Sequence, residues 1–167
     1  MVHEVFLGLG TNLGCREKNL RDALNKVRNH EKIFLERTSS IYETRPVGGP
    51  QGQPWFLNMV VQVKTYLKPH DLLRELKAIE KEMGRKPGVR FGPREIDLDI
   101  LLFDSVTIKT DQLEIPHPRL KERAFVLVPL LEICPAARLP DGTLLKGVLE
   151  KLNPSLEDVV FYKGSPI

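Results

Sequence analysis

The chain has 167 residues and a mass of 19.0 kDa, with 41% hydrophobic and 28% charged residues. This length fits one domain over residues 1–167 and is too short for a full-length α/β barrel, while the composition excludes a disordered chain. Lys and Arg number 25 against 22 Asp and Glu. The resulting net charge of +3 neither requires nor excludes an anionic partner.

Cysteines and apolar runs indicate the compartment. Cys15 and Cys134 lie far apart and form no zinc or redox motif, which is typical of a reducing interior. The chain begins without a basic stretch and has no run of about 18 apolar residues, so we expect no signal peptide and no transmembrane helix. These features predict a cytoplasmic protein, which we expect to be a monomer that does not bind membranes.

Apolar periodicity in the first 65 residues predicts a strand, a helix and two more strands. Residues 5–9 are rich in β-forming side chains, and apolar residues recur at helical spacing over residues 20–28. Residues 38–42 and 56–65 have the pattern of strands, which we expect to be antiparallel neighbours. Between them, residues 44–54 hold three Pro and three Gly and predict an irregular loop of a functional kind.

The middle of the chain predicts one more helix and strand. A helix opens at Pro69 and ends at Gly84, and a basic loop over residues 84–94 leads to a strand over residues 96–103. Residues 106–108 are expected to pair back as a short hairpin arm. The order strand, helix, strand, strand, helix, strand is the βαββαβ plan of a ferredoxin-like α+β sandwich.

Residues beyond the sandwich predict C-terminal helical additions. Residues 115–133 form a loop that leads into a short helix, and Asp141-Gly142 marks a turn. A further helix is expected over residues 144–152 and a final strand over residues 159–162.

The sharpest chemical feature is the pair Asp97 and Asp99 inside an apolar strand. Residues two apart in a strand point to the same face, about 6.6 Å apart along the chain. Two carboxylates there repel each other, and Mg²⁺ between them is the best candidate for the missing positive charge. The alternative is a solvated strand face whose carboxylates pair with nearby arginines.

Basic residues precede this pair and favour a polyphosphate ligand. No glycine in the chain is followed by lysine, so a Walker loop is excluded and arginines and metals must hold any phosphates. Glu80 lies at the edge of its helix's buried stripe, and its alternative reading is a solvated glutamate that pairs with Arg85 or Lys77. His117 lies between two prolines and could donate to phosphate, although a lone histidine is more often structural.

Two other functions compete with phosphate transfer. GLGTNLG at residues 8–14 is similar to a dinucleotide fingerprint, but Leu13 stands where a glycine is needed and the predicted strands lack parallel βα units. An NAD(P)-dependent oxidoreductase is therefore disfavoured. RNA-recognition domains share the βαββαβ plan, but WFLNMVVQVK does not match their aromatic strand signature. A nucleic-acid-binding module is disfavoured for that reason.

RFGPREIDLDILLF resembles the signature of 6-hydroxymethyl-7,8-dihydropterin pyrophosphokinases, folate-pathway enzymes that transfer pyrophosphate from ATP to a pterin alcohol. The resemblance extends over nearly the whole chain through GLGTNLG, SSIYETRPVGGPQGQPWFLN, AIEKEMGR and IPHPRLKERAFVLVPLLEI. It implies ATP and the pterin alcohol as partners, with no nucleic acid.

By this resemblance the functional residues fall into three groups. The residues expected at the reacting groups are Arg85, Arg90, Arg94, Asp97 and Asp99, of which Asp97 and Asp99 would bind two Mg²⁺ ions. The residues expected to line the ATP site are Glu80, Lys86, Arg94, Ile100, His117 and Arg123. The residues expected to bind the pterin are Thr44, Val47, Phe56, Asn58 and Phe125.

The chemistry of the residues expected to bind the pterin suits a flat heterocycle. A flat heterocycle suits two aromatic faces, here Phe56 and Phe125, and an amide such as Asn58 offers both a donor and an acceptor. Phe56 shares the strand parity of Asn58, and its alternative role is that of a core aromatic residue. We also expect the loops over residues 44–54 and 84–94 to close over the bound substrates.

Overall fold

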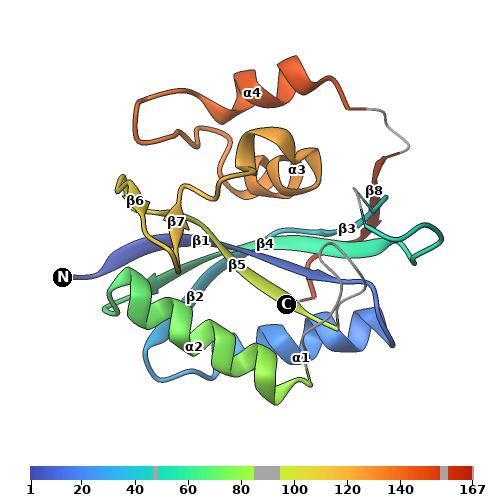
Figure 1. The fold of residues 1–167 in the computed structure, drawn as a ribbon, viewed down its shortest axis with the longest axis horizontal. Helices are drawn as coiled ribbons and strands as arrows, with labels where there is room; N and C mark the ends of the chain where they lie inside the picture. Colours follow the sequence, from blue (N-terminus) through green and yellow to red (C-terminus); the bar gives the residue numbers. More distant parts are fainter. Residues whose placement is uncertain (47–48, 85–94, 155–157, 167) are drawn as a thin grey trace.

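The computed structural model of the protein describes residues 1–46, 49–84, 95–154 and 158–166. Its helices and strands follow the predicted order closely (Figure 1). In chain order they are β1 (His3–Thr11), α1 (Arg16–Arg28), β2 (Ile33–Thr38), β3 (Ile41–Thr44), β4 (Phe56–Thr65), α2 (Pro69–Glu82), β5 (Asp97–Phe103), β6 (Ile108–Lys109), β7 (Glu114–Ile115), a 3-10 turn (Leu120–Glu122), α3 (Ala124–Ile133), α4 (Leu145–Leu152) and β8 (Val159–Lys163).

The main sheet has the strand order β5-β1-β4-β3-β8, and β2 also pairs with β4. All of these pairs are antiparallel. β1 and β4 therefore occupy the centre of the sheet, and β5 lies at one edge. This arrangement confirms the predicted βαββαβ plan of the α+β sandwich, and β8 confirms the predicted terminal strand.

The prediction of one strand over residues 38–42 was wrong, because this segment is the break between two strands. β2 ends at Thr38 and β3 begins at Ile41. Between them Ser39 is buried, its backbone amide donates to the carbonyl oxygen of Val60 at 2.9 Å, and its hydroxyl accepts the amide of Val60 at 2.9 Å. A serine side chain thus replaces a strand carbonyl and interrupts the ladder.

The hairpin arm expected at residues 106–108 was also wrong. The chain leaves β5 through Asp104, which has a φ of 46° and whose carboxylate accepts the amide of Glu4 at 2.8 Å. These contacts bind the turn to β1, so the short hairpin forms later, between β6 and β7. Its turn is closed by Thr110, whose amide donates to the carbonyl of Leu113 at 2.9 Å.

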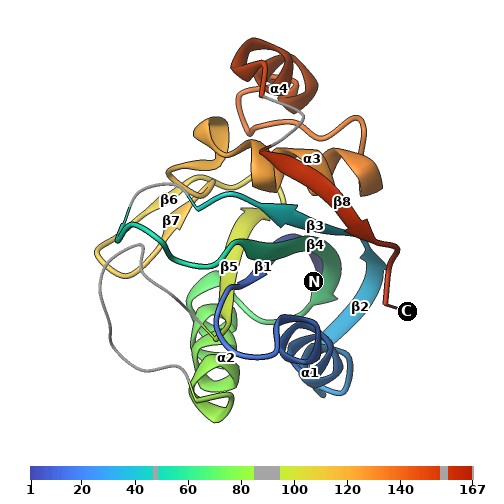
Figure 2. The ribbon, with the colours of Figure 1, turned by 90° about the vertical axis from the view of Figure 1, so that its right-hand side faces the viewer.

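Helices cover both faces of the sheet, with α1 and α2 on one side and α3 and α4 on the other (Figures 1 and 2). The predicted apolar stripe of α1 is buried in full. The stripe of α2 is buried at Leu72, Leu76 and Ile79, and Glu80 joins it while Met83 is only partly buried. In the described part of the chain no helix is long and apolar enough to cross a membrane.

Candidate active site

A floor of glycines lies at the centre of the α3 side of the sheet. In the strand register, Gly10 of β1 lies opposite Asp97 of β5 on one side and opposite Asn58 of β4 on the other. Gly8 likewise lies opposite Asp99. A Cβ atom on Gly10 would lie 2.6 Å from Oδ1 of Asn58, so any larger residue here would displace the Asn58 side chain.

Asp97 and Asp99 share one face of the sheet, as the strand period predicts. Leu98 and Ile100 point into the core on the α1 and α2 side, so the two carboxylates point to the α3 side, where they are half-buried. Among the described residues no third Asp, Glu, His or Cys joins them in a cluster. Two carboxylates suit Mg²⁺, which commonly completes its octahedron with water and substrate phosphates.

Glu80 fixes the strand that carries these aspartates. Glu80 is 2% exposed, and its Oε2 accepts the backbone amide of Leu98 at 2.7 Å. Lys77 donates to Oε1 at 3.2 Å. Because β5 lies at the edge of the sheet, Glu80 satisfies an edge amide between the two aspartates. The alternative expectation was a solvated glutamate paired with Arg85 or Lys77. The pairing with Lys77 is confirmed, but Glu80 is buried and not solvated.

His117 and Arg123 lie in the segment between β7 and α3. The amide of His117 donates to the carbonyl of Leu101 at 3.0 Å, and its Nδ1 accepts the amide of Arg119 at 3.1 Å. Burial, followed by the charges of Arg123 and Arg119, lowers the pKa of His117 to about 4. The ring is therefore neutral at pH 7 and carries its proton on Nε2.

Arg123 is half-buried and electrostatically coupled to both aspartates. Burial lowers the pKa of its guanidinium, while the carboxylates of Asp99 and Asp97 act in the opposite direction. The same guanidinium lies 5.4 Å from the ring centroid of Phe125. Arg123 thus connects the carboxylate pair with the predicted aromatic face.

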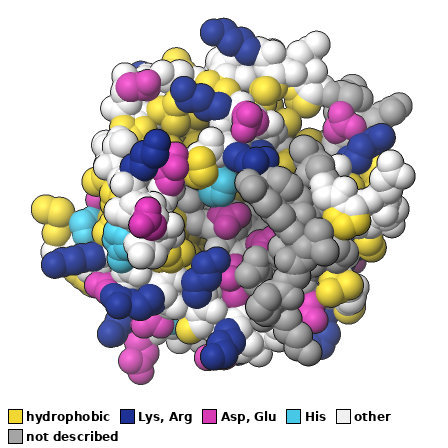
Figure 3. All heavy atoms as spheres, in the orientation of Figure 1, with side chains coloured by type: hydrophobic (Ala, Val, Ile, Leu, Met, Phe, Trp, Pro, Cys, Tyr) yellow, Lys and Arg dark blue, Asp and Glu magenta, His cyan; other side chains and the backbone are white. Residues whose placement is uncertain are grey.

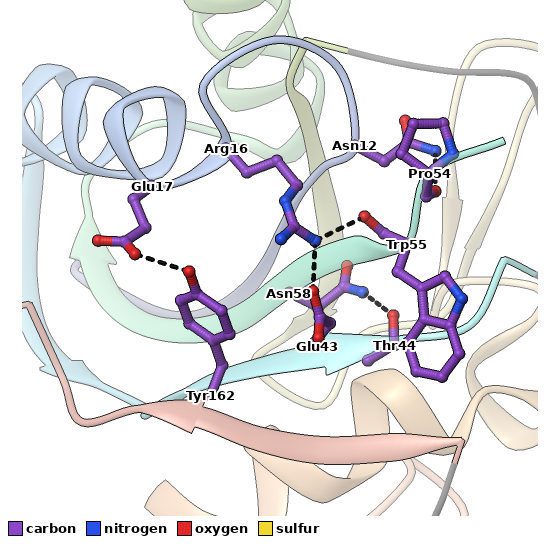
Figure 4. Close-up of polar contacts among 9 residues, drawn as sticks. All are labelled: Asn12, Arg16, Glu17, Glu43, Thr44, Pro54, Trp55, Asn58 and Tyr162. Carbon is purple, nitrogen blue, oxygen red and sulfur yellow. Dashed lines mark hydrogen bonds and ion pairs between the residues drawn. The ribbon is translucent and has the colours of Figure 1, made fainter.

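Thr44, Phe56 and Asn58 lie together at the other end of this floor. Thr44 lies opposite Phe56 in the register of β3 and β4, and Nδ2 of Asn58 donates to Oγ1 of Thr44 (Figure 4). Thr44 is 1% exposed and Asn58 8%, whereas Phe56 is half-buried. The amide of Asn58 is therefore fixed before any ligand arrives.

The remaining predicted residues divide between the core and the undescribed segments. Phe125 is half-buried at the start of α3 and packs against the core beneath that helix. Ile100 is 3% exposed and its side chain belongs to the core. The predicted residues that lie outside the described segments are Val47, Arg85, Lys86, Arg90 and Arg94.

The α3 side is hollowed beside His117. Figure 3 views the molecule with α3 and α4 above the sheet and α1 and α2 below it, and acidic side chains and a histidine gather near the centre of this view, with basic side chains around them. A cavity of about 340 Å³ lies next to His117. Its lining residues are Thr107, Glu114, Pro116, His117, Pro118, Leu120, Lys121, Leu139, Pro140 and Asp141.

Two polar residues were missed from the sequence, one in the turn after β1 and one at the start of α1. Asn12 is 1% exposed and donates to the carbonyl of Pro54 at 2.9 Å, and Arg16 donates to the carbonyl of Trp55 at 2.9 Å (Figure 4). The sequence feature that could have indicated them is the presence of Asn12 and Arg16 within GLGTNLGCR. The spacing of its glycines alone predicts only a tight turn. Both residues contact the segment just before Phe56.

Residues 6–135 match the family model described as 7,8-dihydro-6-hydroxymethylpterin-pyrophosphokinase (HPPK). The chain is 51% identical over 129 residues to the 2-amino-4-hydroxy-6-hydroxymethyldihydropteridine pyrophosphokinase of Bacillus subtilis (strain 168), covering 77% of each chain. It is 45% identical over 131 residues to the enzyme of the same name from Aquifex aeolicus (strain VF5), covering 78% of this chain and 80% of the relative.

Longer proteins match over part of their length. The mitochondrial folate synthesis bifunctional protein of Arabidopsis thaliana is 49% identical over 135 residues, which are 81% of this chain and 24% of that protein. The solved structure of wild-type Plasmodium falciparum HPPK-DHPS with pterin and p-hydroxybenzoate has a TM-score of 0.70 at 19% identity, covering 90% of this chain and 42% of that one. The chain thus spans less than half of these two proteins, and the structural likeness supports the fold.

Proposed function

The chain belongs to the 7,8-dihydro-6-hydroxymethylpterin-pyrophosphokinase family, and we propose that the glycine floor of its sheet holds the two substrates of that reaction. The protein transfers pyrophosphate from ATP to the hydroxymethyl group of 6-hydroxymethyl-7,8-dihydropterin. The products are AMP and the pterin diphosphate, in a step of folate biosynthesis. The observation that carries the proposed site is the register of Asp97, Gly10 and Asn58 across three adjacent strands.

ATP would lie over the β5 end of this floor. We propose that Asp97 and Asp99 hold two Mg²⁺ ions, which would neutralise the phosphates and polarise the oxygens of the reacting group. The family resemblance assigns the nucleotide contacts to Glu80, Ile100, His117 and Arg123 and to the basic residues Arg85, Lys86, Arg90 and Arg94. Glu80 is buried and holds the amide of Leu98, so its role would be to position β5 under the nucleotide.

The pterin would lie over the β4 end. Phe56 and Phe125 come from different elements and are both half-buried, which leaves part of each ring for a stacked heterocycle. Asn58 is held by Thr44 and would read the amide edge of the pterin, and Val47 would complete the contacts. The alternative role of Phe56 as a core aromatic is weakened by its partial exposure.

In the reaction, the pterin hydroxyl oxygen bonds to the β-phosphorus as the bond to the α,β-bridging oxygen breaks, and AMP leaves with that oxygen. The hydroxyl proton passes to solvent. Arg123 would stabilise negative charge on the transferred group, since its guanidinium lies within electrostatic range of the two aspartates that would bind the metal ions. Neutral His117 would donate from Nε2 to a phosphate oxygen, without taking a proton from the nucleophile.

The competing functions from the sequence are disfavoured by these comparisons. We propose that the chain acts as a single cytoplasmic domain and a monomer, without a nucleic-acid partner. The support for a single domain is that β5, β4 and β3, which carry residues assigned to the substrates, belong to one sheet.

Mass detection of products tests the function. Wild-type protein incubated with ATP, MgCl₂ and the pterin alcohol is expected to yield AMP and pterin diphosphate in equal amounts, and D99N is the matched control. Formation of ADP and a pterin monophosphate would contradict the reaction, and retention of poly(U) RNA or NADPH without turnover would favour one of the competing functions.

A further inference from the structure

Arg16, the first residue of α1, joins the ends of two strands on which the proposed pterin residues lie. Its Nη1 lies 2.7 Å from Oε2 of Glu43 and donates to the carbonyl oxygen of Trp55 at 2.9 Å. Glu43 precedes Thr44 at the end of β3, and Trp55 precedes Phe56 at the start of β4. One guanidinium therefore contacts both sides of the paired residues Thr44 and Phe56 (Figure 4).

Neighbouring contacts strengthen this connection. Asn12 donates from Nδ2 to Oε1 of Gln53 at 3.0 Å and to the carbonyl of Pro54 at 2.9 Å. The ring of Tyr162 in β8 lies 5.8 Å from Cζ of Arg16, on another side of the guanidinium. Residues 53–55 are thus held by the β1–α1 turn, which also follows directly after the glycine floor.

Helix stability does not explain an arginine at this position. A cation in the first turn of a helix faces the positive end of the helix dipole, which is unfavourable. The side chains of Arg16 and Glu43 are 25% and 33% exposed, so both are partly desolvated. The contacts to Glu43 and Trp55 therefore account for the arginine better than its place in α1 does.

We infer that Arg16 is a positioning residue for pterin binding: it holds the ends of β3 and β4 so that Thr44, Phe56 and Asn58 keep their binding geometry in the free protein. This inference rests on the proposed pterin site. Preorganisation of this kind raises affinity because the ordering is complete before the ligand binds. Arg16 itself need not touch the substrate, and the nucleotide half of the site, on β5, lies two strands away from β4.

Substitution with a matched control tests the inference. R16M keeps the aliphatic stem but removes both contacts, R16K keeps a charge near Glu43 without the guanidinium fork, and E43Q removes only the ion pair. K18M is the control, because Lys18 lies on the same helix in an exposed pair with Asp22. The readouts are the Kd of the pterin in the presence of a non-hydrolysable ATP analogue, the Kd of the analogue alone, and the Tm.

We expect R16M to raise the Kd of the pterin about tenfold, the equivalent of about 1.4 kcal/mol, with R16K and E43Q intermediate. The Kd of the ATP analogue is expected to change by less than about twofold, or about 0.4 kcal/mol. K18M is expected to leave both constants unchanged. In the N58A background R16M is expected to add little, because Arg16 would act through Asn58 and its neighbours.

Each contrary outcome has a defined meaning. An unchanged pterin Kd in folded R16M, or equal losses for pterin and nucleotide that follow the fall in Tm, would overturn the positioning role. If N58A and F125A also leave the pterin Kd unchanged, the proposed pterin site fails as well. If those two variants lose affinity while R16M does not, only the present inference fails. Should R16M not fold, R16K and E43Q decide the same comparison.

Discussion

Replacing Gly10 with alanine is expected to weaken pterin binding while leaving the protein folded. The new Cβ would lie 2.6 Å from Oδ1 of Asn58, about 1 Å inside the ~3.5 Å at which non-bonded atoms attract. Asn58 cannot simply turn away, because it is 8% exposed and bonded to Thr44. Phe56 also closes the space, with its Cδ1 3.7 Å from the added atom.

The energetic terms can be compared. Relief of the clash costs either overpacking strain of about 1–3 kcal/mol or the Asn58–Thr44 hydrogen bond, about 0.5–1.5 kcal/mol. Alanine in place of glycine within a strand raises the free energy of unfolding by about 0.5–1 kcal/mol. The net change in unfolding free energy lies between a gain of about 0.5 kcal/mol and a loss of about 2.5 kcal/mol, which leaves the protein folded. A displaced Asn58 amide is expected to weaken pterin binding by about 1–3 kcal/mol, or roughly tenfold to a hundredfold.

G8A is the matched control on the same strand. Its Cβ would lie 3.4 Å from Cδ2 of Leu101, an ordinary contact with a flexible apolar side chain. Calorimetric titration of the pterin into each variant with a non-hydrolysable ATP analogue, together with chemical denaturation, separates affinity from stability. Equal pterin affinities for wild type, G8A and G10A would refute the close approach as the reason for Gly10.

Three further expectations follow from the site. D97A and D99N are expected to abolish turnover at saturating Mg²⁺ while the Tm stays the same or rises, since one of two repelling charges is lost; normal turnover in either would refute the metal role. F125A is expected to weaken the pterin by about 1–3 kcal/mol in calorimetry with little change for ATP, and an unchanged Kd would return Phe125 to the core. Because the pKa of His117 is lowered in the folded state to about 4, the contribution of this group to stability is present above about pH 6.5 and is lost as the pH falls towards 4. The difference in Tm between wild type and H117Q is expected to change over that range, and parallel pH profiles would contradict the half-buried neutral ring.

Local periodicity predicted the parts of the fold and site that depend on neighbouring residues in the sequence. The strand period placed Asp97 and Asp99 on one face, and the parity of β4 placed Phe56 with Asn58. Contacts between distant segments could not be predicted in this way. The approach of Gly10 to Asn58 depends on the pairing of β1 with β4, and the contact of Arg16 with Trp55 crosses 39 positions of the chain.

The two wrong strand predictions have the same origin. Ser39 interrupts the edge of the sheet through a side-chain bond to Val60, and Asp104 turns the chain through a bond to Glu4. In both cases a polar side chain bonds to the backbone of a segment that is remote in sequence. Helical spacing predicted that Glu80 lies at the edge of the apolar stripe of its helix. Its burial is explained by the bond to the edge amide of Leu98, which is remote in sequence.

A crystal structure of the ternary complex with Mg²⁺, the pterin alcohol and a non-hydrolysable ATP analogue tests the central claim most directly. The glycine floor is expected to carry the pterin between Phe56 and Phe125, with its amide edge bonded to Asn58 and the β-phosphorus in line with its hydroxyl. Asp97 and Asp99 are expected to face the phosphates through metal ions. A pterin bound away from Asn58, or aspartates paired with arginines and without metal, would contradict the account.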